Sequence, residues 1–110
     1  MSETAATHIA VVTTLPSRAA AQDLARALVS RGLAACAQIS EIESFYVWDG
    51  ALQQEPEFRL LLKTRAALYA PLEAAIRAAH PYELPAIHAL ALQALSEPYA
   101  RWLDAQTAAG

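Results

Sequence analysis

Two long β-strands joined by a tight turn constrain the fold of this chain more than any other feature. Residues 33–64 are rich in apolar and β-branched side chains, and the dipeptide Asp49-Gly50, typical of two-residue hairpin turns, divides them. Before the turn, Ile42, Tyr46 and Trp48 have the same parity and therefore share one face of a strand. The segment predicts a long antiparallel hairpin.

Strand and helix patterns surround this hairpin in a definite order. The expected elements are a strand at 8–14, a helix at 17–32, the two hairpin strands, a helix after residue 68, a strand at 86–95 and a helix at 96–107. Ser17 and Ser96 are suitable N-caps, and Gly32 can take the positive φ that ends a helix. The order β-α-β-β-α-β with an extra C-terminal helix predicts an α+β, ferredoxin-like sandwich.

Length and charge exclude several classes of protein. A chain of 110 residues has room for one core, so we expect a single domain over residues 1–110 with its core at about 8–107. The net charge of −3 argues against nucleic acid as a partner. No apolar run is long enough to span a membrane, and the N-terminus lacks a signal pattern. With Cys36 as the single cysteine, these features predict a cytoplasmic protein.

The apolar content predicts association between chains. Hydrophobic residues make up 55% of the sequence and charged residues 17%, although alanine contributes much of the first figure. The predicted strands carry more apolar positions than one small core can bury. We therefore expect part of this surface to be covered by other copies of the chain.

The hexapeptide "HPYELP" at residues 80–85 predicts a stiff corner after the second helix. Pro81 ends the helix near His80, and Pro85 keeps the residue before it extended. Three polar-capable side chains, His80, Tyr82 and Glu83, are thus held between two prolines, which is an arrangement suited to a binding site. A purely structural corner is the alternative.

Two residues are candidate metal ligands. The Cys36 thiolate would suit a soft ion such as Cu(I), whereas a cysteine within a strand is also commonly a small buried apolar residue. The His80 imidazole could bind a metal or interact with the C-terminal end of the helix dipole. No spaced cluster of cysteines and histidines accompanies them.

Five residues are candidates for a ligand-binding cleft between subunits: Trp48, Glu57, Lys63, Tyr82 and Glu83. Lys63 is the only lysine, and it could bind an anion, pair with Glu57 or Glu83 across a subunit boundary, or extend from the sheet end towards water. Trp48 and Tyr82 could line a pocket or pack at an interface. The glutamates suit pairing better than catalysis, since no nucleophile adjoins them.

Five separated motifs make the chain resemble the CutA family of divalent-cation tolerance proteins. They are "LAAC", "SFYVWDG", "LLLKT", "HPYELP" and "YARWL", in the order and spacing of that family. The resemblance implies a homotrimer joined through sheet edges, related in architecture to the PII signalling proteins. It also implies binding of copper or another divalent metal, with no organic cofactor.

The sequence departs from that family at the expected cleft. Ala86 follows the second proline where many relatives have glutamate, and His88 stands where an aliphatic residue is usual. A carboxylate is lost there and an imidazole gained.

Two functions remain, and neither is enzymatic. One is a metal-binding, metal-responsive homotrimer, and the other is a PII-like module that binds a small anionic metabolite between subunits. An acylphosphatase is excluded because the chain contains no asparagine to position water.

Overall fold

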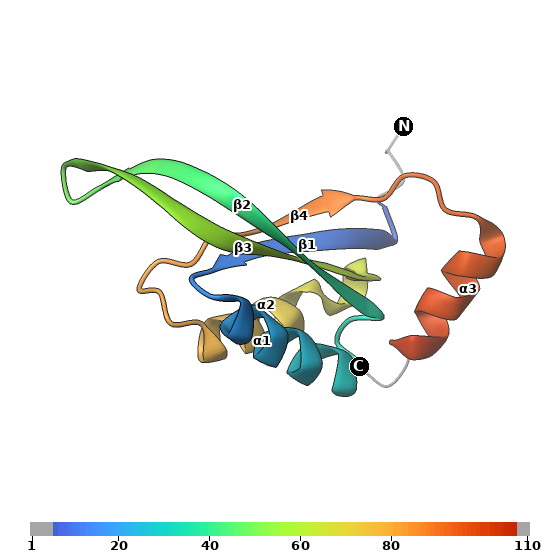
Figure 1. Cartoon of the computed structure of the whole chain (residues 1–110). Coiled ribbons are helices and arrows are strands. Elements are labelled where there is room, and N and C mark those ends of the chain that lie inside the picture. Colours follow the sequence, from blue (N-terminus) through green and yellow to red (C-terminus); the bar gives the residue numbers. More distant parts are fainter. Residues whose placement is uncertain (1–5, 108–110) are drawn as a thin grey trace.

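The computed structural model describes residues 6–107, so both predicted limits of the domain, residues 1 and 110, lie outside the described part. Its elements are β1 (His8–Leu15), α1 (Arg18–Ser30), β2 (Cys36–Trp48), β3 (Ala51–Arg65), a 3-10 turn (Ala66–Leu68), α2 (Tyr69–Ala79), β4 (Ile87–Ala91) and α3 (Glu97–Gln106). This is the predicted α+β, ferredoxin-like order with the extra C-terminal helix (Figure 1).

The four strands form one antiparallel sheet in the order β2-β3-β1-β4. Helices α1 and α2 cover one face of this sheet, which we call the helix face (Figure 1). The opposite face, which we call the open face, has no such layer, and α3 lies at one end of the sheet. The outer edges of β2 and β4 pair with no other strand in the described chain.

The core lies between the helix face and the two helices. Alternation along β1 puts Val11 and Leu15 on this face, and Leu60 and Leu62 of β3 join them. The helices complete the cluster with Ala21, Leu24, Leu28, Leu72 and Ile76. Ser17 caps α1 as predicted, since its Oγ accepts the amide N–H of Ala20 at 3.1 Å.

The β2-β3 hairpin extends far beyond the other two strands. Residues 49 and 50 form its turn with φ values of 56° and 78°, the positive pair of a type I′ turn. The ladder then runs without a bulge from Trp48↔Ala51 to Cys36↔Lys63. Because β1 pairs with β3 only from Phe58 onwards, the distal half of the hairpin is a two-stranded ribbon.

The fourth strand is shorter than the sequence predicted. We expected residues 86–95, and β4 covers only Ile87–Ala91. Its partner β1 begins at His8, whose carbonyl accepts the Leu92 N–H at 2.9 Å, so little ladder remains beyond that point.

Helix α3 is held to the sheet end by polar contacts. Arg65 donates from Nε to Thr107 Oγ1 at 2.9 Å and also hydrogen-bonds the Thr107 carbonyl. His8 Nε2 lies 2.8 Å from Asp104 Oδ1. Among the described residues, no helix is long and apolar enough to cross a membrane.

Candidate functional site

A groove of about 770 Å³ lies between the open face of the hairpin and the corner at residues 80–85. The sheet register explains its walls, because Ile42, Ser44, Tyr46 and Trp48 alternate along β2 and all face it. The predicted shared face of Ile42, Tyr46 and Trp48 is therefore confirmed.

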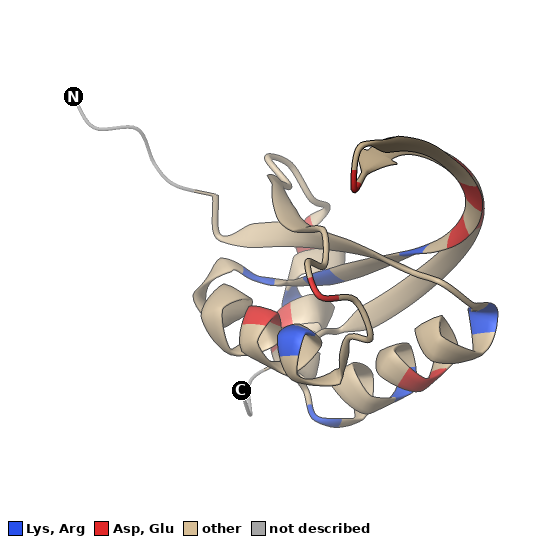
Figure 2. Ribbon diagram, turned by 90° about the vertical axis from the view of Figure 1, so that its left-hand side faces the viewer, with Lys and Arg blue, Asp and Glu red and all other residues tan. Residues whose placement is uncertain are grey.

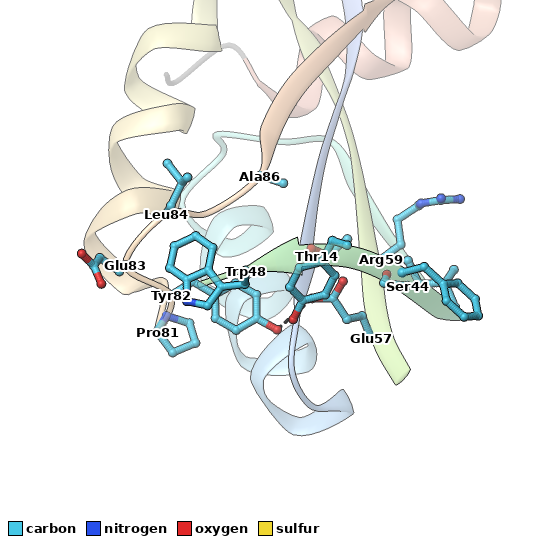
Figure 3. Close-up of a pocket in the computed structure, with 13 residues that line it drawn as sticks. Thr14, Ser44, Trp48, Glu57, Arg59, Pro81, Tyr82, Glu83, Leu84 and Ala86 are labelled. Carbon is cyan, nitrogen blue, oxygen red and sulfur yellow. Dashed lines mark hydrogen bonds between the residues drawn. The ribbon is translucent and has the colours of Figure 1, made fainter. Parts of the chain in front are cut away.

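Strands β1 and β3 and the corner complete the groove. Glu57 stands opposite Ile42 in the ladder, and Arg59 pairs with Thr14 of β1. From the corner come Pro81, Tyr82, Glu83 and Leu84, followed by Ala86. Figure 3 shows Trp48, Tyr82 and Glu57 in the middle of the site, with the Glu83 carboxylate at its outer margin.

The corner is held in place by His80. Its Nδ1 accepts the Tyr82 amide N–H at 3.1 Å, so the ring proton lies on Nε2 and is donated to the Thr14 carbonyl at 2.8 Å. The imidazole thus joins the corner to the end of β1. Its ring also lies 4.9 Å from the Tyr82 ring, which helps to fix that side chain.

Tyr82 places its hydroxyl on a buried carboxylate. The hydroxyl donates to Glu57 Oε2 at 2.8 Å, and Glu57 is only 7% exposed (Figure 3). Burial and then this hydrogen bond raise the pKa of Tyr82, so the phenol stays protonated. In the described part of the chain, no arginine, lysine or histidine lies within ion-pair distance of Glu57.

The distal part of the hairpin is acidic. Residues 41–58 contain Glu41, Glu43, Asp49, Glu55 and Glu57 and no lysine or arginine. Figure 2 shows acidic positions, in red, along the curved ribbon of the hairpin. The Tyr46 hydroxyl hydrogen-bonds Glu55, which raises the pKa of Tyr46 to about 12.

Four of the five predicted cleft residues meet at this groove: Trp48, Glu57, Tyr82 and Glu83. Lys63 is elsewhere, because it lies at the other end of the hairpin, opposite Cys36. Its Nζ is 5.7 Å from the centre of the Tyr99 ring of α3. Within one chain, Lys63 therefore pairs with neither glutamate and does not line the groove.

The two predicted metal ligands are also apart. Cys36 is level with Ala10 of β1, whereas His80 contacts Thr14, four residues and about 13 Å further along the strand. Cys36 Sγ lies 3.9 Å from the Tyr99 hydroxyl. Over residues 6–107, no group of three or more Cys, His, Asp or Glu side chains could hold a metal ion.

Some residues of the groove were not predicted. Arg59 and Thr14 also line it. Arg59 could have been predicted, because residues two apart in a strand share a face and Glu57 was already a candidate. Ala86, where the family resemblance led us to expect a carboxylate, lines the groove, while His88 is exposed on β4 outside it.

Known proteins resemble this chain over nearly its whole length. A family model described as CutA1 divalent ion tolerance protein matches residues 9–106. A probable divalent-cation tolerance protein cutA homolog of Encephalitozoon cuniculi is 40% identical over 95 residues, which are 86% of this chain and 83% of that protein.

Solved structures agree with the same assignment. CutA from Synechococcus elongatus has a TM-score of 0.90 and 36% identity, over 93% of this chain and 91% of that chain. The periplasmic divalent cation tolerance protein CutA from Archaeoglobus fulgidus has a TM-score of 0.89 and 31% identity, over 91% of this chain and 98% of that one.

Proposed function

This chain belongs to the CutA1 divalent ion tolerance protein family, and we propose that it acts in divalent-cation tolerance as a homotrimeric binding protein rather than an enzyme. The single cysteine, Cys36, is consistent with a reducing, cytoplasmic location. One observation supports assembly most directly: the projecting hairpin has apolar side chains that remain exposed to water in an isolated chain.

The surface of this hairpin supports assembly. Phe45, Val47 and Leu52 are 59%, 68% and 72% exposed and share the hairpin face opposite to Tyr46 and Trp48, although Phe45 also borders the groove at the strand edge. Contiguous exposed apolar residues of this kind are typical of protein interfaces. The open edges of β2 and β4 could pair with strands of other copies, which supports joining through sheet edges.

A metal ion would need donors from more than one subunit. Both ring nitrogens of His80 are engaged within the chain, so this residue does not fit a ligand role without breaking the corner. The partly buried Cys36 thiol is the other predicted ligand. One sulfur cannot fill the coordination sphere of copper, so we place any site of modest affinity between subunits.

The charge of the groove favours a cation over an anionic metabolite. Glu57 and Glu83 line it, and Arg59 is the single basic side chain among its described lining residues. Lys63, the expected contact for an anion, lies outside the groove of its own chain. We therefore prefer a cation-binding function to the PII-like alternative and propose the groove as a ligand site.

Titration calorimetry with Cu(II) and Zn(II) tests the metal assignment. We expect both ions to bind the assembled protein, and Cys36→Ser to weaken binding. His80→Ala should instead leave metal affinity unchanged and lower the melting temperature, because it removes two hydrogen bonds of the corner. Loss of affinity in His80→Ala at unchanged stability would show that the imidazole is a ligand.

Growth on copper tests the function itself. A bacterial strain lacking its own CutA protein should tolerate more Cu(II) when it produces this chain than when it carries an empty vector. Equal sensitivity of the two strains, with the protein present and folded, would contradict a role in cation tolerance.

A further inference from the structure

We infer that the groove binds a small organic cation of the alkylammonium class, with Glu57 as its counter-ion and the rings of Trp48 and Tyr82 as its walls. The inference rests on the groove being the ligand site proposed above. It does not depend on metal binding by Cys36.

Glu57 is the first reason. The residue is only 7% exposed and faces no basic side chain in the described part of the chain; the neutral Tyr82 hydroxyl donates to Oε2, and the unpaired Oε1 stays accessible from the groove. A buried charge without a partner of opposite sign is unfavourable. The site is therefore complementary to a positive charge that can also donate N–H hydrogen bonds.

The aromatic walls are the second reason. Trp48 is 47% exposed and lies with Tyr82 on one side of the groove (Figure 3). Faces of tryptophan and tyrosine attract organic cations electrostatically, and Trp provides the strongest such surface. Because the Tyr82 hydroxyl is committed to Glu57, this ring has a fixed position beside the carboxylate.

The distribution of charge excludes the opposite polarity of ligand. Arg59 is the basic lining residue, and Figure 3 shows its guanidinium directed away from Trp48, Tyr82 and Glu57. No lysine or arginine occurs in residues 41–58, and Glu55 and Glu57 of this segment lie on the groove side of the hairpin. An anion at the aromatic end would meet unfavourable electrostatic interactions.

The size and lining of the groove favour a carbon-bearing cation over a bare metal ion. About 770 Å³ is available, and Ile42, Pro81 and Leu84 provide apolar contacts for methylene groups. A metal ion would need several donor atoms around it, whereas Glu57 is the carboxylate at the centre and Glu83 lies at the margin.

Binding of n-butylammonium to the assembled protein tests the inference, with butan-1-ol and butyrate as neutral and anionic isosteres. The measurements use the Trp102→Leu background, in which Trp48 is the sole tryptophan and reports by its fluorescence. The substitution is needed because Trp102, on α3, is 43% exposed, close to the 47% of Trp48, so the emission of the two residues would not be separable in the parent. We expect a saturable change in emission with butylammonium and a much weaker one with either isostere.

Two variants localise the site. Glu57→Gln keeps an acceptor for Tyr82 but removes the charge, and should weaken butylammonium binding at least about fivefold. Glu43→Gln is the matched control, since Glu43 lies on the same hairpin but on the opposite face, and it should bind like the parent.

Three results would overturn the inference: equal affinity for butylammonium and butan-1-ol, unchanged affinity in Glu57→Gln, or a change in oligomeric mass of Glu57→Gln. The last would mean that a basic residue of a neighbouring subunit is the counter-ion. Cu(II) binding without butylammonium binding would contradict the alkylammonium site and leave the proposed role in divalent-cation tolerance intact. Butylammonium binding without copper tolerance would defeat only the divalent-cation role.

Discussion

Two buried threonines on the helix face show how much a single hydroxyl can matter here. Thr64 and Thr13 are both fully buried, on β3 and β1 respectively. Thr64 donates to the Leu33 carbonyl at 2.8 Å, whereas the Thr13 hydroxyl has no hydrogen-bond partner within residues 6–107. A buried hydroxyl without a partner is unfavourable, so the same side chain has opposite effects at the two positions.

Substitution by valine tests this difference. Thr13→Val should raise the free energy of unfolding by about 1 kcal/mol, because valine keeps the shape and removes an unpaired hydroxyl. Thr64→Val should lower it by about 1–3 kcal/mol, because the Leu33 carbonyl loses its donor. Urea denaturation of both variants at one protein concentration measures the changes, and destabilisation by Thr13→Val would contradict the account.

At the residue scale, the sequence predicted which side chains lie close together but not which hydrogen bonds they form. The two prolines predicted the corner, and alternation predicted the groove-facing positions of β2. The role of His80 depends on the Thr14 carbonyl, which is distant in sequence, and no local pattern reports such a contact. The position of Lys63 likewise depends on the ladder register with Cys36, which the turn sets.

Among the elements, α2 carries a side-chain ladder that responds to pH. Arg77 donates from Nε to Glu73 Oε2 at 3.1 Å, and Tyr69 and Arg77, one turn away on either side, lower the pKa of Glu73 below its ordinary value of 4.5. A carboxylate whose pKa falls on folding stabilises the fold above that ordinary value. The contribution is lost as the pH falls through the folded pKa.

Glu73→Gln should therefore melt at a lower temperature than the parent at about pH 7, and the difference should shrink as the pH falls below 4.5 and through the lowered pKa. Thermal unfolding by circular dichroism at several pH values measures this. A difference that persists unchanged in acid would assign the effect of Glu73 to packing rather than to its charge.

At the scale of elements, prediction was most successful where the signal is local. Asp49-Gly50 identified the turn because few residues adopt two consecutive positive φ values, and Ser17 and Ser96 identified helix starts through their side-chain caps. The fourth strand was overestimated, because its length depends on where β1 begins to offer partners.

At the scale of the whole molecule, the hairpin leaves two surfaces that a single chain does not satisfy. The core of strands and two helices is complete within one chain, while the hairpin extends beyond it with exposed apolar residues on one face and an acidic, aromatic groove on the other. Homotrimeric assembly would cover the exposed apolar face, and a bound cation would balance the negative charge of the groove. Both proposals follow from the hairpin reaching past β1.

Sedimentation equilibrium of the intact chain tests assembly, the central claim, most directly. The account predicts a single species of three times the 11.8 kDa chain mass at micromolar concentration. Val47→Asp, which places a charge on the exposed apolar face, should shift this species towards smaller mass while the helix content is retained. A stable 11.8 kDa monomer of the unmodified chain under the same conditions would contradict the account.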